Sequence, residues 1–409
     1  MTALMRWAAV LFSTVVVTAG CTGSTGETTR SATPTSSTSP APAGEPVATP
    51  LLARPVAAPI PVPGTDGRTH LAYELLLTNV LSQDVTVSTV TVQGGGASLL
   101  SLSGDALAHW TRILGAAAKP TTTIGPAQTA AVWIDATVAP GNIPTRLDHT
   151  ITVALSQPAP PLLPPIMTET VAPVTVQTRK PVQIAPPLRG PKWLDANGCC
   201  EMTPHRMALN PLDGQLWAAE RFAIDYVQLD PGYRLLNGPA GKLTSYPYFG
   251  TDIHAVADGP VVAVLDGLPE QVPGQTPTGL PLDQYAGNHV VQDLGNGNYA
   301  LYAHLKTGSV KVQPGQRLTS GQVLGSLGNT GNSDAPHLHF HVMDSPDPLR
   351  SDGLPFVFTS FRLDAQTASI DVFDTLIAGK PAPLRPGSHA RDESEVTPLV
   401  SDVMDYSGE

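Results

Sequence analysis

The chain has 409 residues, of which 41% are hydrophobic and 14% charged, so it can bury at least one sizeable core. Its 42 prolines and its low aromatic content of 5% favour short strands and extended segments, which argues against an all-α fold. The formal net charge of -11 argues against nucleic acid or anionic lipid as the main partner, because phosphate binding requires a cationic surface. We therefore expect an all-β protein with two or three domains, at roughly 150 residues per domain.

Residues 1–20 have the features of a bacterial export signal. A short positive segment ends at Arg6, and the apolar run from Trp7 to Val17 is well short of the ~20 residues that cross a bilayer. The small residues before Cys21 resemble a lipobox, although Thr18 departs from the usual pattern. We expect a lipoprotein signal peptide and a lipidated Cys21 that anchors the protein to the extracytoplasmic side of the cell membrane. Ordinary secretion is the alternative.

The next three segments differ in composition. Residues 21–64 are rich in Thr, Ser, Pro and Ala, which predicts a disordered tether. Residues 65–157 contain β-branched runs separated by Gly and Pro, which predicts a β-sandwich of immunoglobulin-like type. Residues 158–192 are rich in proline, so we expect a linker, because proline cannot join a central strand ladder.

A second folded unit is expected at residues 193–362. Its short apolar runs are separated by turn sequences such as Asp213-Gly214, Asp258-Gly259 and Pro314-Gly315, so it is also predicted to be β. Residues 363–409 contain a few apolar runs and are expected to pack on this unit as a C-terminal extension.

The strongest functional signal is an alternating histidine motif. His337, His339 and His341 are separated by Leu338 and Phe340, so on a strand the three imidazoles share one face and the apolar residues face the core. Such a face can bind a metal or divide its imidazoles between metal binding and catalysis. The alternative is an edge strand with surface histidines.

A buried carboxylate and a cysteine pair add to this signal. Asp225 lies in an otherwise apolar strand, and a buried carboxylate needs a metal or a counter-charge. Arg221 is expected on the same strand face, so an ion pair between the two is the alternative to a metal. Cys199 and Cys200 are expected to form a vicinal disulfide or to be inert buried thiols, because no further Cys lies at zinc-ligand spacing.

Several spaced motifs together resemble the lysostaphin/LytM-type zinc metallopeptidases of peptidoglycan. The resemblance covers about residues 204–342 and includes, in chain order, Gly250-Thr251, Ala255 to Val262, Tyr302 to Leu305, Gly328 to Gly331 and Pro336 to Phe340. It implies an antiparallel β domain of the duplicated hybrid motif type, with a groove and a Zn²⁺ site.

The resemblance also implies roles for individual residues. Asp225 and His339 take the positions of metal ligands, and His304 and His337 take the positions of the catalytic histidines that stabilise charge in the transition state. The family's remaining ligand is a His four residues before the Asp, where this chain has Arg221, whose guanidinium cannot bind zinc.

A hairpin offers a substitute for the missing ligand. If residues 205–209 and 215–219 pair around a five-residue turn, His205 lies on the same face as Asp225. His205 is therefore the expected third metal ligand. His341 is the alternative ligand, and a site without metal is the third interpretation.

These inferences lead to one main functional hypothesis and one rival. We expect a zinc metalloendopeptidase that hydrolyses peptide bonds in cell-wall peptidoglycan, with no nucleic-acid partner. The rival is a catalytically degenerate domain that binds peptidoglycan or activates another hydrolase, and Arg221 is the residue that favours it. The sequence specifies neither the bond that is cleaved nor the oligomeric state.

Overall fold

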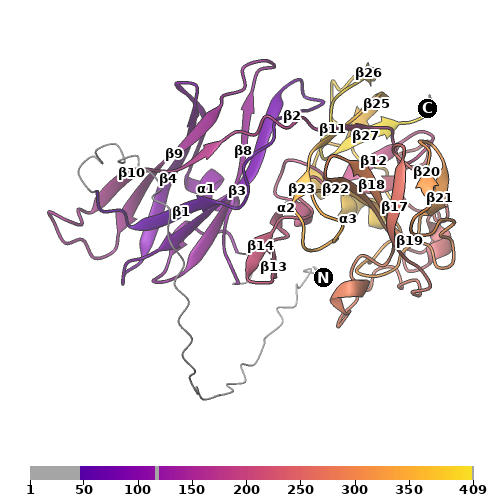
Figure 1. The fold of residues 1–409 in the computed structure, drawn as a ribbon, viewed down its shortest axis with the longest axis horizontal. Helices are drawn as coiled ribbons and strands as arrows, with labels where there is room; N and C mark the ends of the chain where they lie inside the picture. The colour runs from indigo at the N-terminus through magenta and orange to yellow at the C-terminus, as the bar shows by residue number, and fades with distance from the viewer. Residues whose placement is uncertain (1–46, 116–118, 408–409) are drawn as a thin grey trace, which may run out of the picture.

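A computed structural model describes residues 47–115 and 119–407, which form two β-rich lobes (Figure 1). The all-β fold class is confirmed, since helices in this part of the chain are few and short. Among these residues no helix has the length and apolar character needed to span a bilayer. The expected signal peptide and Cys21 lie outside the described residues.

The first lobe contains two antiparallel sheets that share one apolar core. The first sheet has the order β1 (Leu51–Pro55), β3 (Thr69–Asn79), β8 (Thr129–Val138), β6 (Thr111–Ile113), and β2 (Val62–Pro63) also pairs with β3. The second has the order β10 (Ile166–Thr175), β9 (Arg146–Leu155), β4 (Val85–Gly94), β5 (Ala97–Ser103), and β7 (Thr123–Ile124) also pairs with β4. Side chains from both sheets, including Tyr73, Val90 and Ile134, form the core. The lobe is thus a sandwich, and its immunoglobulin-like type stays a prediction.

The sandwich extends beyond the expected boundaries at both ends. Strands β1 and β2 lie in the segment expected to be a tether, and β10 lies in the segment expected to be a linker. Both β1 and β10 pair on one side alone, and edge strands tolerate proline because they need fewer backbone donors. Pro173 lies at the register shift between Val171 and Val174. Proline content was therefore misleading about these strands.

The second lobe is built on one long antiparallel sheet. Its order is β20 (Arg317–Leu318), β17 (Gly259–Leu265), β18 (Asn288–Gly295), β19 (Asn298–Leu305), β22 (Leu338–Met343), β15 (Ile224–Gln228), β12 (Trp193–Ala196), β27 (Asp402–Asp405), β25 (Phe361–Gln366), β26 (Arg391–Glu393), and β23 (Gly353–Leu354) also pairs with β22. The core beneath this sheet includes Trp193, Tyr226, Tyr302 and Phe340. Three C-terminal strands extend the same sheet, so residues 363–409 contribute to this lobe.

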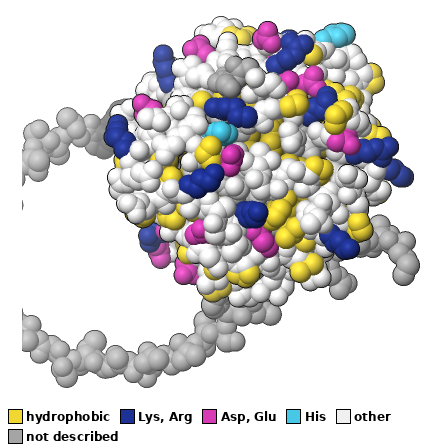
Figure 2. All heavy atoms as spheres, turned by 90° about the vertical axis from the view of Figure 1, so that its right-hand side faces the viewer, with side chains coloured by type: hydrophobic (Ala, Val, Ile, Leu, Met, Phe, Trp, Pro, Cys, Tyr) yellow, Lys and Arg dark blue, Asp and Glu magenta, His cyan; other side chains and the backbone are white. Residues whose placement is uncertain are grey.

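Pairs of shorter strands flank the long sheet. Strand β11 (Val182–Ile184) runs parallel to β24 (Phe356–Phe358), and β16 (Asp252–His254) pairs with β21 (Val323–Ser326). The face shown in Figure 2 carries basic and acidic side chains interspersed with apolar ones.

The position of β22 in the sheet determines where the functional residues meet. Strand β22 lies between β19 and β15, so His339 is directly opposite Ala303 on one side and Asp225 on the other. His304 follows Ala303 near the end of β19. Backbone pairing thus places Asp225 directly beside His339, and it brings the backbone of His304 next to them.

The segment that leads into β15 departs from the expected hairpin. Helix α2 (Pro204–Met207) carries His205, and it is followed by β13 (Asn210–Leu212) and β14 (Gln215–Trp217). These strands pair around the two-residue turn at Asp213-Gly214, which has positive φ angles of 50° and 75°, as a type I′ turn requires. The five-residue turn is therefore wrong, and His205 lies on a helix.

Helix α2 and strands β13 and β14 lie between the two lobes (Figure 1), and the residues just before α2 contact the sandwich. Cys199 and Cys200 form a disulfide, in agreement with one of the two expected states, and they cluster with Val62 and Ala72 of the sandwich. Met202 clusters with three sandwich residues: Leu76, Ala131 and Trp133. Since successive residues of a strand face opposite ways, these contacts lie on the outer face of the sandwich.

Candidate metal centre

One carboxylate in the second lobe is surrounded by imidazoles. Asp225 lies 3.2 Å from His205 (Oδ2 to Nε2), 2.9 Å from His339 (Oδ1 to Nδ1) and 3.3 Å from His337 (Oδ1 to Nε2). Asn197 Nδ2 also donates a hydrogen bond to Asp225 Oδ2 at 2.8 Å. His205 and His339 are buried, whereas the side chains of Asp225 and His337 each remain 13% exposed. The cluster is therefore enclosed but still reached from solvent.

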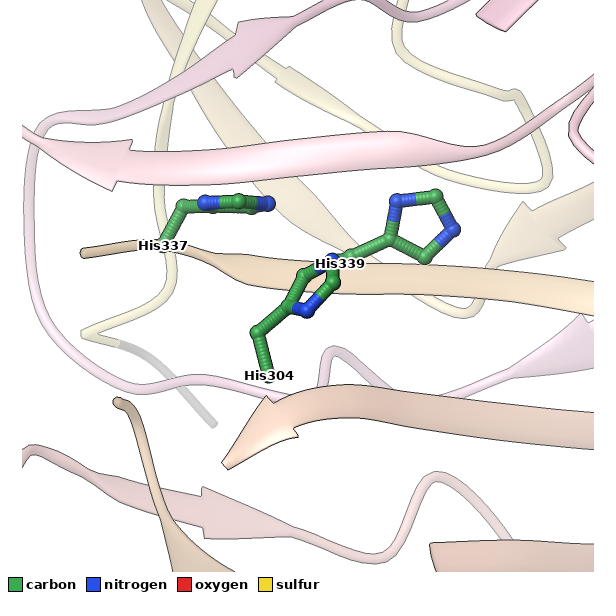
Figure 3. Close-up of side chains that lie close together, drawn as sticks. All are labelled: His304, His337 and His339. Atoms are coloured by element: carbon green, nitrogen blue, oxygen red, sulfur yellow. The ribbon is translucent and has the colours of Figure 1, made fainter. Parts of the chain in front are cut away.

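Three of the histidines come from two neighbouring strands. Figure 3 shows His337 and His339 along one chain segment and His304 at the end of the next strand, with its ring directed toward them. His339 and His341 lie on β22, with their rings on the face opposite to Leu338 and Phe340, as alternation predicts. His304 has a positive φ of 59°, which is uncommon for a residue other than glycine, and it lies one residue before the end of β19.

Three imidazoles are oriented by hydrogen bonds from their Nδ1 atoms to backbone carbonyls. These bonds are His205 to Ala223 (3.1 Å), His304 to Thr330 (2.7 Å) and His337 to Ala335 (2.8 Å). Because a carbonyl oxygen only accepts, each Nδ1 carries the proton, and each Nε2 is left for the cluster. This is how proteins usually orient histidine for metal binding or proton transfer.

His339 is oriented by another histidine. Its Nδ1 faces Asp225, and its Nε2 lies 3.0 Å from His341 Nδ1. His341 is buried behind His339, and its Nε2 has no hydrogen-bond partner among the described residues. The geometry therefore favours His205 over His341 as the third donor beside Asp225 and His339.

The donor atoms of His205, Asp225 and His339 lie within 4.8 Å of one another. Ligand atoms about 2 Å from a tetrahedral zinc ion are roughly 3.4 Å apart. The separations of 3.2 Å and 2.9 Å from the Asp225 oxygens are close to that value. Two imidazoles and one carboxylate are also a donor set that zinc accepts, so these residues fit the ion. His304, His337 and His339 form a second, overlapping group.

The cluster also separates the protonation states of its members. Burial opposes the charged form of Asp225, but His205 and His337 outweigh it and hold the pKa of Asp225 well below its usual range. Burial likewise opposes charge on His205, yet Asp225 raises its pKa to about 9. Burial, followed by the neighbouring His337 and His339, holds the pKa of His304 well below its usual range. His304 is therefore neutral at pH 7.

The alternative interpretation, an ion pair between Arg221 and Asp225, is wrong. Arg221 precedes β15 in a turn, where its N–H bonds the Ala218 carbonyl at 3.2 Å, so it does not share the strand face of Asp225. Its guanidinium instead bonds the sandwich residue Glu74, with Nε 3.0 Å from both carboxylate oxygens and Nη2 2.6 Å from Oε2. A weaker contact of 3.4 Å reaches Asp352.

Sequence reasoning missed two residues near the site, Asn197 and Glu74. Asn197 is a polar residue just after β12, and nothing in its sequence context indicates a bond to Asp225. Glu74 had a clear signal, because it is an acidic residue amid the apolar run of β3, and its side chain is fully buried. The argument that singled out Asp225 applies to it equally.

Comparison with known proteins identifies part of the second lobe. Residues 246–351 match the model of peptidase family M23. The chain contains an M23 peptidase domain. The match includes His304, His337 and His339, and it begins after His205 and Asp225. The family resemblance drawn from the motifs is therefore confirmed.

Curated relatives match over this domain. The peptidoglycan DD-endopeptidase ShyA of Vibrio cholerae is 32% identical over 105 residues, which is 26% of this chain and 22% of the relative. The glycyl-glycine endopeptidase ALE-1 of Staphylococcus capitis is 33% identical over 111 residues, which is 26% of each chain. This chain thus spans about a quarter of the length of these relatives.

Solved structures align at low overall similarity. The catalytic domain of lysostaphin from Staphylococcus simulans has a TM-score of 0.23 and 19% identity, and the alignment covers 40% of this chain and 88% of that domain. A zinc-containing peptidase from Vibrio cholerae has a TM-score of 0.21 and 14% identity, with 69% of this chain and 80% of that structure covered.

Proposed function

We propose that the second lobe is a zinc metalloendopeptidase that hydrolyses peptide bonds in peptidoglycan. The observation that carries this proposal is the convergence of donor atoms from His205, Asp225 and His339 beside His304 and His337. The substrate class is supported by relatives named as endopeptidases, one acting on peptidoglycan and one on glycyl-glycine bonds.

His205 Nε2, an Asp225 carboxylate oxygen and His339 Nδ1 would hold the ion. Zn²⁺ bound there supplies Lewis-acid polarisation of the scissile carbonyl and lowers the pKa of an attacking water molecule. Asp225 orients this donor set from the centre, because Asn197 fixes one of its oxygens and His337 contacts the other. The carbonyl of Ala223 keeps the His205 ring turned toward Asp225.

His304 and His337 act on the substrate. Their rings are 4.8 Å apart, and both Nδ1 protons are bound to carbonyls, so their Nε2 atoms carry out the proton transfer. His304 is neutral and can accept a proton at Nε2. Asp225 favours a proton on His337 Nε2, which can donate a hydrogen bond to the oxyanion that develops during peptide cleavage.

The rival function is a degenerate domain that binds peptidoglycan or activates another hydrolase. One observation favours it: Arg221 replaces a ligand of the family and is held away from the cluster by Glu74. A domain of this kind binds peptidoglycan fragments, yet it neither retains stoichiometric zinc nor releases cleavage products.

Metal analysis combined with mass spectrometry distinguishes these two functions. The zinc-loaded full chain is incubated with defined muropeptides, and the products are identified by mass. We expect one zinc per chain and new peptide termini. The His339→Ala variant serves as the inactive reference, and His109→Ala, which changes an exposed histidine of the sandwich helix α1 (Gly104–His109), serves as the matched control. A zinc-free protein that binds the fragments without cleaving them would establish the rival function.

We also propose that Cys21 is lipidated and that the protein is anchored on the extracytoplasmic side of the cell membrane. Support comes from the signal-like residues 1–20 and the small residues before Cys21. Cys21→Ser is expected to move the protein from the membrane fraction to the soluble fraction. Unchanged fractionation and processing of that variant would refute the proposal.

A further inference from the structure

A fully buried carboxylate of the sandwich joins the two lobes next to the metal centre. Glu74 lies on β3 and has an exposed fraction of 0%. Arg206 Nη1 donates to its Oε1 at 2.9 Å, and Arg221 binds both of its oxygens. Both arginines belong to the second lobe and are themselves buried. One sandwich carboxylate therefore pairs with two arginines of the second lobe, and Asp352, 3.4 Å from Arg221, is a further acidic partner. Leaving these buried charges unpaired would be strongly unfavourable.

The two arginines flank the candidate metal ligands along the chain. Arg206 directly follows His205 in helix α2, and Arg221 lies four residues before Asp225. Arg206 Nη2 also donates to the backbone carbonyl of Ile134 in β8 at 3.1 Å. Arg206 therefore contacts β3 and β8, the two central strands of the first sandwich sheet. These bonds tie both ends of the segment 206–221 to the sandwich.

His205 depends on this attachment more than the other ligands do. Asp225 and His339 lie on paired central strands of the sheet, whereas α2 has four residues and belongs to no sheet. A helix this short contributes little stability of its own. The backbone bonds of α2 are local ones, from Met207 to Thr203 and from Ala208 to His205.

Apolar contacts support the same segment from the same side. Met202 packs against Leu76, Ala131 and Trp133, on the outer face of the sandwich. Cys199 and Cys200 pack against Val62 and Ala72 on that face. The segment 199–207 is thus supported by the sandwich, and it supplies His205 to the centre (Figure 1).

We infer that the sandwich is a structural part of the metal centre and that Glu74 is its positioning residue. Through Arg206 and Arg221, Glu74 holds the segment that places His205 beside Asp225. This inference rests on the proposed function in that the ion is zinc. Linkage adds a consequence: if the lobe contact strengthens zinc binding, zinc strengthens the lobe contact by the same factor.

The test compares zinc affinity in two full-length variants that each neutralise one buried glutamate of the sandwich. Glu74→Gln removes the charge that the arginines need. Glu169→Gln is the matched control, since Glu169 is also buried but lies on β10, at the far side of the sandwich (Figure 1). We expect zinc to bind roughly 10–100-fold more weakly to Glu74→Gln, as when an outer-sphere partner is lost, and equally well to Glu169→Gln.

Further readouts distinguish positioning from general destabilisation. The visible spectrum of bound Co²⁺ should change in Glu74→Gln, because His205 leaves the ligand set, and Glu74→Asp should restore part of the wild-type spectrum. Without metal, hydrogen exchange should rise at residues 199–207 of Glu74→Gln and stay unchanged in β22. If Glu74→Gln does not fold, Arg206→Gln leaves the Glu74–Arg221 pair intact and should show the same changes.

Each outcome has a definite meaning. Equal zinc affinity in wild type and Glu74→Gln, with equal exchange at residues 199–207, overturns the inference and leaves the proposed function standing. A wild type that binds no zinc overturns the proposed function, and the metal-free exchange measurement then decides whether Glu74 holds the segment. Equal losses in Glu74→Gln and Glu169→Gln would reduce the role of Glu74 to general stability and also overturn the inference.

Discussion

The two lobes each contain a cluster of imidazole and carboxylate groups, with opposite proportions. In the sandwich, His70 lies between two carboxylates, with Nδ1 2.9 Å from Asp135 and Nε2 3.2 Å from Asp66. In the second lobe, the single carboxylate of Asp225 faces His205, His337 and His339. One added proton satisfies the hydrogen bonds of the sandwich cluster, since an imidazolium donates from both nitrogens to the two carboxylates.

A single proton cannot satisfy the cluster at Asp225 in that way. Its imidazoles outnumber the carboxylate, and protonating several of them would place like charges in contact. A divalent cation uses the same lone pairs without that repulsion. His70, Asp135 and Cys200 also lie close enough to share an ion, but the Cys200 sulfur is bonded to Cys199 and offers no thiolate. What distinguishes a metal site from an ion pair is therefore the ratio of imidazoles to carboxylates and the lone pairs that stay free, and not how close the groups lie.

The largest effect is expected from removing a ligand that lies on β22. His339→Ala should weaken zinc binding by more than about 100-fold, which exceeds the usual loss from an outer-sphere partner. Competition with a chelator measures this affinity, and His70→Gln in the other cluster is the control. Loss of zinc from His70→Gln would show that the two clusters have been assigned the wrong roles.

His205→Ala should lose zinc about as severely as His339→Ala, again by more than about 100-fold, if His205 is the third ligand. Adding Arg221→His to this variant should fail to restore zinc, because residue 221 lies outside β15, and its loss also removes a partner of Glu74. Metal analysis of the folded single and double variants tests both points. Recovery of zinc in the double variant would show that residue 221 reaches the site.

His304→Ala should separate catalysis from metal binding. Its ring contacts the cluster, but the donor atoms of His205, Asp225 and His339 converge without it. Zinc should therefore be retained, while the rate of muropeptide cleavage falls about 10²–10⁴-fold, as for loss of a general acid or base. Parallel loss of zinc and rate would instead make His304 a ligand.

His341→Ala should have a milder effect on the metal. If His339 Nδ1 binds the ion, its Nε2 carries the ring proton and donates it to His341 Nδ1, 3.0 Å away, so removal of His341 frees that ring to rotate. Zinc affinity should fall about tenfold, at the low end for an outer-sphere partner, because the carboxylate and His205 remain. Titration of the folded variant measures the change, and a loss as large as in His339→Ala would make His341 the missing ligand.

The smallest effect is the pH dependence contributed by His70. Burial opposes its charge, but Asp135 and Asp66 outweigh burial and raise the His70 pKa above the ordinary value of about 6.5. The stabilisation is thus complete below about pH 6.5 and disappears as the pH rises through the folded-state pKa. Denaturant unfolding should show that the difference in free energy of unfolding between wild type and His70→Gln becomes smaller as the pH rises over this range. A difference that grows with pH would contradict the ion pair.

The predictable part of the site depended on regular strands. Alternation placed His337 and His339 correctly, and the cost of burying a carboxylate singled out Asp225. His205 was selected through a hairpin register that the Asp213-Gly214 turn does not have, and the residue lies beside Asp225 for another reason. That reason includes Glu74, which is 132 residues from Arg206, and local sequence patterns carry no information about such a distant pair.

The sandwich boundaries were missed for a related reason. An edge strand can be as rich in proline and small residues as a tether. Only pairing with a neighbouring strand distinguishes the two. Leu51 pairs with Asn79, and Ile166 pairs with Ala154. The core strands of both lobes were recognisable because their apolar character does not depend on knowing the partner.

The pairing of β12 with β27 has a consequence for the order in which the second lobe is assembled. Trp193 and Leu194 bond on one side to β15, which carries Asp225, and on the other to Met404 and Val403. Synthesis reaches β27 roughly 200 residues after β12, and domains generally fold as units while the chain emerges. Until then β12 is an open edge beside the metal centre, where another chain can add a strand. Completion of β27 therefore covers this open edge next to the candidate metal centre.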